Sequence, residues 1–226
     1  NLFRDKRVLL TGETLVLATS NGRECFLSSL RLLIRICSDV SVSLPVDFGS
    51  LLTECRRIAD REASGVHVEF FGQAPDFKFY DAILCVGETA CPHLPWTVIN
   101  SNGWLARVSS GSTNLPSNCE QSNPIAAVAA SCLGVTEIFK RLIRLKESRG
   151  LFWDGLIFSL YSYRSGEAEP GPQLPGVLPL QLLIVGAGAI GNGIVHLLRL
   201  LPVSGQCWVV DQQVFKPENL GTCLLI

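Results

Sequence analysis

The chain has 226 residues, enough for one or two domains with a substantial core. Its 19 basic and 20 acidic residues leave a net charge of −1, so we expect neither nucleic acid nor a membrane surface as a partner. No apolar run approaches the roughly 18 residues that span a bilayer, and no signal peptide is visible, so we expect a cytoplasmic protein.

The cysteines and the absence of methionine bear on the class and completeness of the chain. Nine cysteines, an odd number without CxxC spacing, predict reduced, mostly buried thiols and no metal site. The sequence contains no methionine and stops two strands into a nucleotide-binding pattern. We therefore expect it to be part of a longer polypeptide.

Strand-like and helical segments alternate along most of the chain, which predicts an α/β fold with a largely parallel sheet. The expected strands are residues 6–12, 40–44, 66–71, 82–86, 97–100, 105–109 and 156–163, and the expected helices are 23–37, 51–63 and 122–145. A segment with four prolines and three glycines, residues 166–179, then reads as a linker.

The most informative segment is a glycine-rich turn that follows an apolar strand. Its glycines, Gly186, Gly188 and Gly191, have the GxGxxG spacing. The first glycine permits the tight turn, the second lets a phosphate approach the backbone, and the third allows close packing of helix on strand. Unpaired N–H groups and the dipole at the helix start favour an anion. We predict a nucleotide site here that includes Ala187 and Ala189.

An acid follows at the distance that this site requires. Asp211 ends the next strand, 20 residues beyond Gly191. A carboxylate at that strand's tip can accept hydrogen bonds from the ribose hydroxyls of an adenine nucleotide. The glycine spacing alone does not separate ATP from NAD.

The residues after Asp211 resemble the family of ubiquitin-like-protein-activating enzymes, with its ThiF, MoeB and HesA relatives. There an Asp, often a second acid two residues on, precedes Asn-Leu-x-Arg-Gln. Asn219, followed by leucine, matches this pattern, whereas Gln213 replaces the second acid and Thr222 stands where the family has arginine. The resemblance covers about residues 181–223. It implies that Asn219 holds a phosphate oxygen or the loop itself.

This resemblance implies an adenylyltransferase that uses ATP and Mg²⁺. Its substrate would be the C-terminal glycine carboxylate of a ubiquitin-like or sulfur-carrier-type protein, and a conjugating enzyme would be a further partner. The family's ATP-binding Lys and Mg-binding Asp are expected beyond Ile226. We therefore assign no catalytic residue and expect this chain alone to be incomplete for activity.

The first half of the chain is similar to a second copy of the same arrangement. The strand ending at Gly12 leads into a helix and another strand, but the loop has no further glycines and no acid ends the strand 40–44. Because the family pairs two adenylation domains, as dimers or inactive–active pairs, we expect two tandem Rossmann-like copies, each a mainly parallel sheet flanked by helices. The expected domains are a degenerate, inactive one at 1–165, a linker at 166–180 and the start of an active one at 181–226.

Two alternatives remain open at this point. The glycine turn and Asp211 also suit an NAD-dependent oxidoreductase with a Rossmann cofactor domain. Gln213 and Thr222 suit a non-catalytic scaffold that keeps the activating-enzyme fold. The Asn-Leu pair that begins at Asn219 favours the activating enzyme over the oxidoreductase.

Overall fold

A computed structural model describes residues 3, 5–63, 65–72, 75–145, 150–214 and 216. The chain divides into two compact units, Asn1–Gln173 and Leu174–Ile226. The division falls inside the proline- and glycine-rich stretch, and each unit is described by itself.

Unit 1 contains the strands and helices expected for residues 6–165, most of them displaced by no more than a few residues. The strands are β1 (Arg7–Gly12), β2 (Asp39–Ser43), β3 (His67–Phe71), β4 (Ala82–Val86), β5 (Trp96–Asn102), β6 (Leu105–Ser109), β7 (Leu156–Ser159) and β8 (Arg164–Ser165). The helices are α1 (Thr14–Leu17), α2 (Ser20–Ile36), α3 (Gly49–Glu62) and α4 (Pro124–Leu142), with short 3-10 helices η1 (Val46–Phe48) and η2 (Phe77–Phe79). Helix α4 begins where Asn123 accepts a hydrogen bond from the N–H of Ile125 and Pro124 occupies the first turn.

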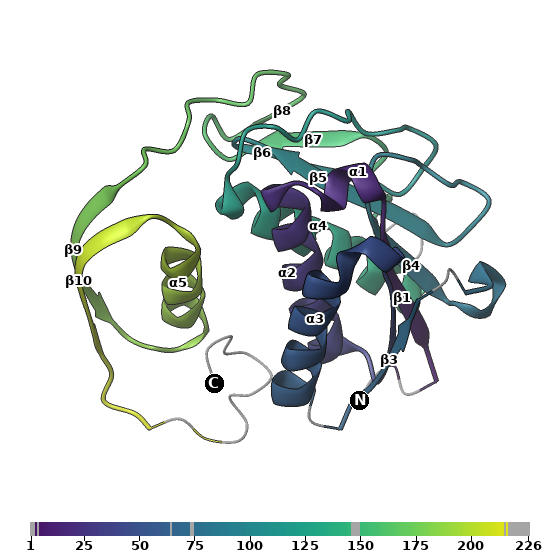
Figure 1. The fold of residues 1–226 in the computed structure, drawn as a ribbon, viewed down its shortest axis with the longest axis horizontal. Helices are drawn as coiled ribbons and strands as arrows, with labels where there is room; N and C mark the ends of the chain where they lie inside the picture. The colour runs from purple at the N-terminus through teal and green to yellow at the C-terminus, as the bar shows by residue number, and fades with distance from the viewer. Residues whose placement is uncertain are drawn as a thin grey trace. The chain divides into compact units, whose positions relative to one another are not determined.

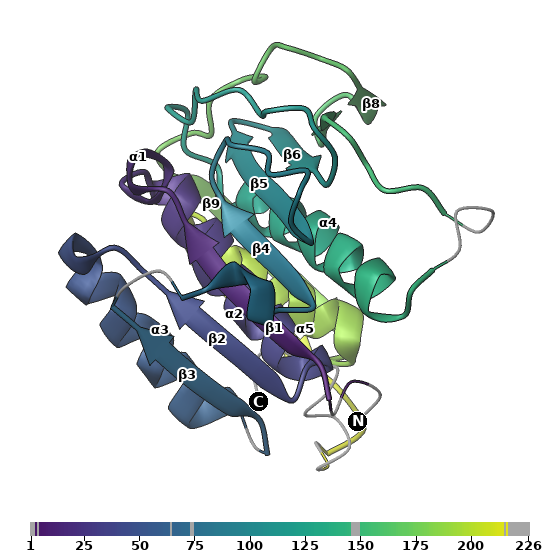
Figure 2. The same ribbon diagram turned by 90° about the vertical axis from the view of Figure 1, so that its right-hand side faces the viewer.

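The strands of unit 1 form one mixed sheet of eight strands in the order β3-β2-β1-β4-β5-β6-β7-β8 (Figure 2). The first five strands pair in parallel. From β5 to β8 every pairing is antiparallel. The direction reverses at a tight turn in which Gly103 has a φ of +54°, so that β6 runs back along β5.

The expectation of two tandem Rossmann-like copies is therefore wrong. Unit 1 is a single α/β domain with a mixed sheet, and the described residues of unit 2 form a small sheet of two strands. The hairpin at Gly103 is the physical reason, since a tight turn returns the chain antiparallel where a further parallel strand would need a crossover helix.

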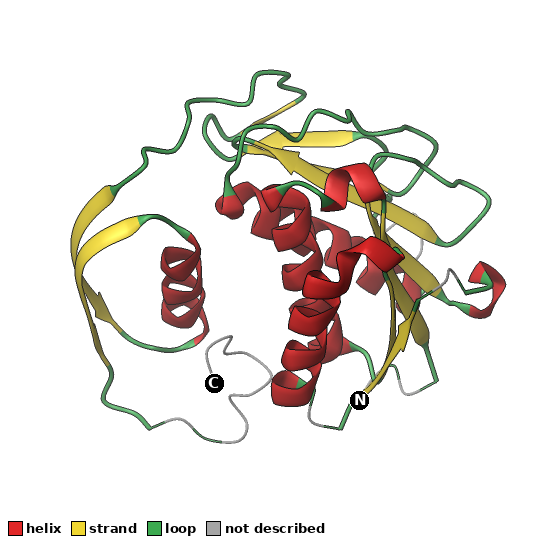
Figure 3. Cartoon of the chain, viewed as in Figure 1, coloured by secondary structure: helices red, strands yellow, loops and turns green. Residues whose placement is uncertain are grey.

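Helices α2, α3 and α4 all cover one face of the sheet in unit 1 (Figures 1 and 3). The main core lies between them and that face, where Val8 and Leu10 of β1 are fully buried. Leu9 points to the opposite face and joins a smaller cluster with Tyr80 and Trp96, which loops cover. This alternation is the period of two expected for a strand buried on both faces.

A buried arginine ties a loop to the edge of this sheet. Arg107 of β6 is only 1% exposed. Its Nη1 atom donates to the side-chain oxygen of Asn100 at 3.3 Å and to the carbonyls of Pro116 and Asn118 at 3.1 and 2.9 Å. The three acceptors share the two hydrogens of Nη1, whereas the buried Nε has no acceptor among the described residues, so the buried charge is only partly compensated.

Unit 2 is a strand–helix–strand unit made of β9 (Leu178–Val185), α5 (Ala189–Leu200) and β10 (Val203–Val210). The two strands pair in parallel over their whole length, from Leu178 beside Val203 to Val185 beside Val210. Strand β9 thus begins three residues before the predicted start at 181. No helix in the described ranges of either unit is long and apolar enough to cross a membrane.

Candidate nucleotide-binding site

The turn between β9 and α5 has the backbone that the glycine pattern predicted for its first position. Gly186 has a φ of +98°, a conformation that side-chain-bearing residues rarely adopt. Its N–H donates to the carbonyl of Val210 at 2.8 Å, which continues the pairing of the two strands to their ends. The turn after β9 and the tip of β10 are therefore held side by side.

The other two glycines differ in what a side chain would meet. A Cβ atom at Gly191 would lie 2.0 Å from the carbonyl oxygen of Gly186, so α5 packs too closely on the turn for any side chain there. A Cβ at Gly188 would meet no described atom within 4 Å. The φ of −65° and ψ of −167° at Gly188 also suit any residue. Nothing in the described protein therefore requires glycine at 188 for packing, and the space in front of it is open.

Helix α5 begins at this open space without a capping side chain from the described residues. Gly188 is the N-cap residue, and the first helical hydrogen bond runs from the N–H of Asn192 to its carbonyl at 2.9 Å. The N–H groups of Ala189, Ile190 and Gly191 precede that bond, where a helix leaves its donors without intrahelical partners. Together with the helix dipole, they can bind an anion.

The carboxylate of Asp211 lies against the same turn. Its Oδ2 accepts from the N–H of Ala187 at 2.6 Å, and its Oδ1 accepts from the N–H of Gln213 at 2.7 Å. These backbone donors, Gln213 first and Ala187 second, hold the pKa of Asp211 below its usual range. The Asp211 carboxylate is therefore anionic at neutral pH. Each of its oxygens can accept a further hydrogen bond, which leaves capacity for ribose hydroxyls.

Six of the seven residues proposed from the sequence thus lie at one turn of unit 2: Gly186, Ala187, Gly188, Ala189, Gly191 and Asp211. Asn219 and Thr222 lie outside the described residues. Gln213, where the activating enzymes often have an acid, donates its backbone N–H to Asp211.

In unit 1, the position at the carboxyl ends of β1 and β4 is occupied by the side chain of Glu13. The order of the sheet reverses between β1 and β4, the position where open α/β sheets bind ligands at the carboxyl ends of the strands. There the carboxylate of Glu13 accepts the N–H groups of Glu88 and Thr89, at 3.2 and 2.9 Å. A Cβ at Gly87 would lie 2.5 Å from the Glu13 carboxyl carbon. Glu13 therefore occupies the backbone donors that a ligand anion would need.

The sequence did not predict this role of Glu13, because the loop after Gly12 differs from a phosphate-binding loop only in its lack of further glycines. The available signal was an acid directly after the strand that ends at Gly12, together with Gly87 after the parallel strand beside it. Their proximity depends on the pairing of β1 with β4, which the sequence does not state.

Neither the two buried thiols of Cys37 and Cys55 nor a metal-ligand cluster gives an alternative centre among the described residues. Burial raises the pKa of Cys37 and of Cys55 to about 12, so these thiols are not nucleophiles at neutral pH. The described His, Cys, Asp and Glu side chains form no group of three that could hold a metal ion.

The fold and this site define an α/β protein with a glycine-rich turn, at the uncapped start of a helix, in a separate strand–helix–strand unit. No protein-family model matches the chain. It is 30% identical, over 209 residues, to the uncharacterized protein y4jF of Sinorhizobium fredii (strain NBRC 101917 / NGR234). The match covers 87% of this chain and 37% of y4jF, so the chain spans little more than a third of the length of this curated relative.

Proposed function

We propose that unit 2 holds the adenine nucleotide of an ATP-dependent adenylyltransferase of the ubiquitin-activating type. The observation that carries the proposal is the open space in front of Gly188, at the uncapped start of α5 and beside the turn that Asp211 holds. A glycine that packing does not require, placed at free helix donors, is what close approach of a phosphate requires.

In this proposal the phosphates lie over Gly188 and accept hydrogen bonds from the N–H groups of Ala189 and Ile190. Gly191 contributes by letting α5 approach the turn, since a Cβ there would meet the Gly186 carbonyl at 2.0 Å. Asp211 accepts hydrogen bonds from the ribose hydroxyls while its bond to Ala187 fixes the carboxylate's orientation. Asn219, if it lies as the resemblance implies, would add a polar contact to the phosphates.

The substrate proposed is the C-terminal glycine carboxylate of a ubiquitin-like or sulfur-carrier-type protein, in the cytoplasm. ATP supplies the adenylyl group: a carboxylate oxygen bonds to the α-phosphorus, and pyrophosphate leaves. Bringing two anions together is the main barrier, which backbone donors and Mg²⁺ offset. The family's Mg-binding Asp is expected beyond Ile226, so no described residue is assigned to Mg²⁺ in this proposal.

Thermal protection distinguishes ATP from NAD. A ligand present at about 100 times its Kd stabilises the folded state by about 2.7 kcal/mol, which raises the melting temperature measurably. The proposal predicts protection by MgATP and not by NAD at equal concentration. Protection by NAD alone would instead support an oxidoreductase, for which Asp211 is equally suited.

Pyrophosphate exchange distinguishes the adenylyltransferase from a scaffold. Incorporation of labelled pyrophosphate into ATP, dependent on a partner that ends in glycine, is the predicted result. ATP binding without exchange for any glycine-ended partner would favour a non-catalytic protein that keeps the nucleotide site.

A further inference from the structure

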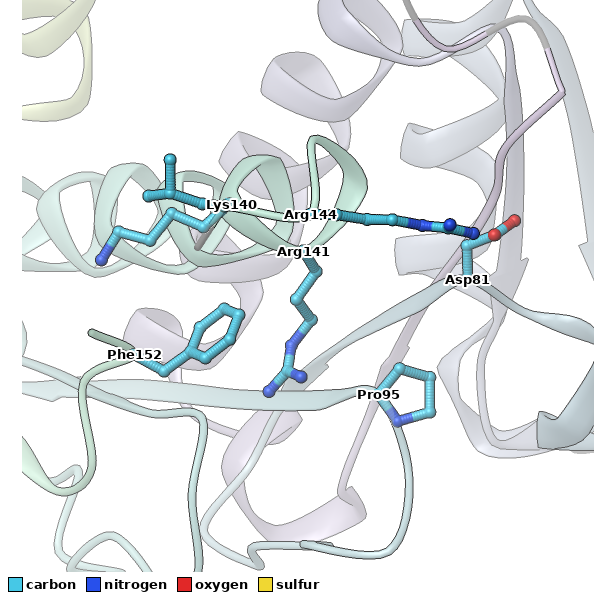
Figure 4. A pocket seen from close by; sticks show the side chains of 7 residues that line it. Asp81, Pro95, Lys140, Arg141, Arg144 and Phe152 are labelled. Atoms are coloured by element: carbon cyan, nitrogen blue, oxygen red, sulfur yellow. The ribbon is translucent and has the colours of Figure 1, made fainter. Parts of the chain in front are cut away.

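A cavity lined by several positively charged side chains lies in unit 1, at the C-terminal end of α4. It has a volume of about 330 Å³, within the lower range of small-molecule sites. Its wall includes Asp81, Pro95, Lys140, Arg141, Arg144 and Phe152 (Figure 4). Asp81 and Pro95 precede β4 and β5, so this pocket lies at the amino ends of these strands, whereas Glu13 lies at the carboxyl end of β1. A ligand of this pocket does not depend on the function proposed for unit 2.

The guanidinium of Arg141 is held by two backbone carbonyls and an aromatic ring, and part of its hydrogen-bonding capacity has no acceptor among the described residues. Its Nη2 donates to the carbonyls of Trp96 and Ser110, at 2.7 and 2.8 Å. The guanidinium carbon lies 4.4 Å from the ring centre of Phe152. Nε is buried and has no acceptor among the described residues. The side chain is thus fixed between Phe152 and Pro95, as Figure 4 shows, before any ligand binds.

Arg144 occupies a backbone position that normally takes glycine. Its φ is +50°, and α4 ends with hydrogen bonds from Arg144 N to Arg141 O and from Leu145 N to Lys140 O, both 3.0 Å. This is the Schellman arrangement, in which Arg144 stands at the glycine-favouring position. The strained residue points its guanidinium toward Asp81 (Figure 4). An arginine kept at a strained position suggests that its side chain has a use.

The charges around the pocket do not balance. Among the described residues, those in or beside it are the cations Lys6, Lys140, Arg141 and Arg144 and the carboxylates Asp81 and Glu137. Lys6 pairs with Asp81 and Lys140 with Glu137, and Arg144 also points toward Asp81 (Figure 4). These cations outnumber the carboxylates by two, and the dipole at the end of α4 contributes about half a negative charge, so the described groups leave a positive balance.

We propose that this pocket binds a small phosphate ester or carboxylate that carries a flat apolar group. The anion lies between Arg141 and Arg144, whose planar guanidinium groups match the geometry of such anions. The apolar group contacts Phe152 and Pro95. Partial burial lowers the pKa of Arg141, and an anion beside it would offset that burial.

Calorimetric titration of the whole chain with phenyl phosphate, benzoate and inorganic phosphate tests the proposal. We expect saturable binding of phenyl phosphate or benzoate, and the tighter of the two identifies the anion. Inorganic phosphate should bind more weakly than phenyl phosphate because it lacks the apolar group. The absence of saturable binding by both aromatic probes would overturn the proposal, and equal binding of inorganic phosphate would overturn the role of Phe152.

The variants separate binding from folding. Arg144→Gln should weaken binding by about tenfold, the loss expected for one charge-assisted contact, whereas Arg57→Gln on the exposed side of α3 should leave it unchanged. Arg144→Gly relieves the positive φ, so this variant should melt no lower than the wild type and still bind about tenfold more weakly. Unchanged affinity in Arg144→Gly would show that the guanidinium is not a ligand.

Discussion

Asp211 accepts a hydrogen bond from the backbone N–H of Ala187 at 2.6 Å, which ties the tip of β10 to the turn after β9. Because Asp211 accepts a second backbone bond from Gln213, its ionised form is favoured and its pKa is lowered. The candidate site is therefore organised by the residue proposed to hold the sugar. Neutralising Asp211 should loosen the turn as well as weaken nucleotide binding.

The pH dependence of this tie follows from the sign of the pKa shift. A carboxyl whose folded-state pKa is depressed contributes stability above its unfolded pKa of about 3.9, and that contribution is lost as the pH falls through the lower folded value. We predict that the amide proton shifts of Ala187 and Gln213 titrate together with a midpoint below about pH 3.9 and are flat above about pH 5. NMR of the labelled chain measures this. A midpoint above about pH 3.9 would contradict the geometry, and Asp211→Asn, which should abolish the transition, is the control.

Gly191 and Gly193 should respond oppositely to alanine. A Cβ at Gly191 would collide with the Gly186 carbonyl, so Gly191→Ala should destabilise unit 2 by about 2 kcal/mol. A Cβ at Gly193, one turn interior in the same helix, meets nothing within 4 Å, so Gly193→Ala should stabilise α5 by up to about 1 kcal/mol. Hydrogen exchange of the β9 and β10 amides reports both. Equal effects in the two variants would mean that α5 does not pack on the turn as described.

Arg107 should be costly to replace despite its position in a strand of apolar neighbours. Arg107→Met removes the donor to the oxygens of Asn100 and Asn118, whereas the Pro116 carbonyl keeps its bond from Asn100 Nδ2; we expect the variant to destabilise unit 1 by about 3 kcal/mol. Arg164→Met, at an exposed strand position, should change stability by less than about 0.5 kcal/mol. Urea unfolding of both variants is the measurement, and a cost for Arg107→Met no larger than for the control would refute the buried network.

A carboxylate ion in solution should be able to take the place of the Glu13 carboxylate once that side chain is removed. Glu13→Ala exposes the N–H groups of Glu88 and Thr89, at a cost of about 1–3 kcal/mol. Acetate at high concentration should raise the melting temperature of this variant relative to chloride of equal ionic strength. Neither the wild type nor Glu120→Ala, an exposed acid, should show that difference. Identical responses of all three proteins would mean that no anion position exists at the carboxyl ends of β1 and β4.

Local pattern was sufficient to predict the elements but not the way they assemble. The strand at 6–12, the helix at 51–63 and the roles of Gly186 and Gly191 follow from periodicity and turn chemistry, which act over a few residues. The antiparallel half of the sheet was missed, although Asn102-Gly103 between two strand-like segments is a hairpin signal.

The missed functional contacts are those between residues distant in the sequence. Glu13 meets Thr89 only because β1 pairs with β4, and Arg141 meets Phe152 only because the chain returns beside α4. Similarly, the described residues between β3 and β4 form the short η2 and no crossover helix, which leaves α2, α3 and α4 together on one face. Such relationships require the topology and cannot be deduced from spacing.

The affinity of the chain for MgATP, compared between Gly188→Ala and Gly193→Ala by calorimetry, tests the central claim most directly. A methyl group at either position meets no atom of the described protein within 4 Å, so both variants should fold, with a cost of at most about 1 kcal/mol for Gly188→Ala because Gly188 is the N-cap of α5. The account predicts at least about tenfold weaker binding for Gly188→Ala, because its methyl group occupies the space of a phosphate, and unchanged binding for Gly193→Ala. Wild-type affinity in Gly188→Ala would contradict the proposal that nucleotide phosphates lie at the start of α5.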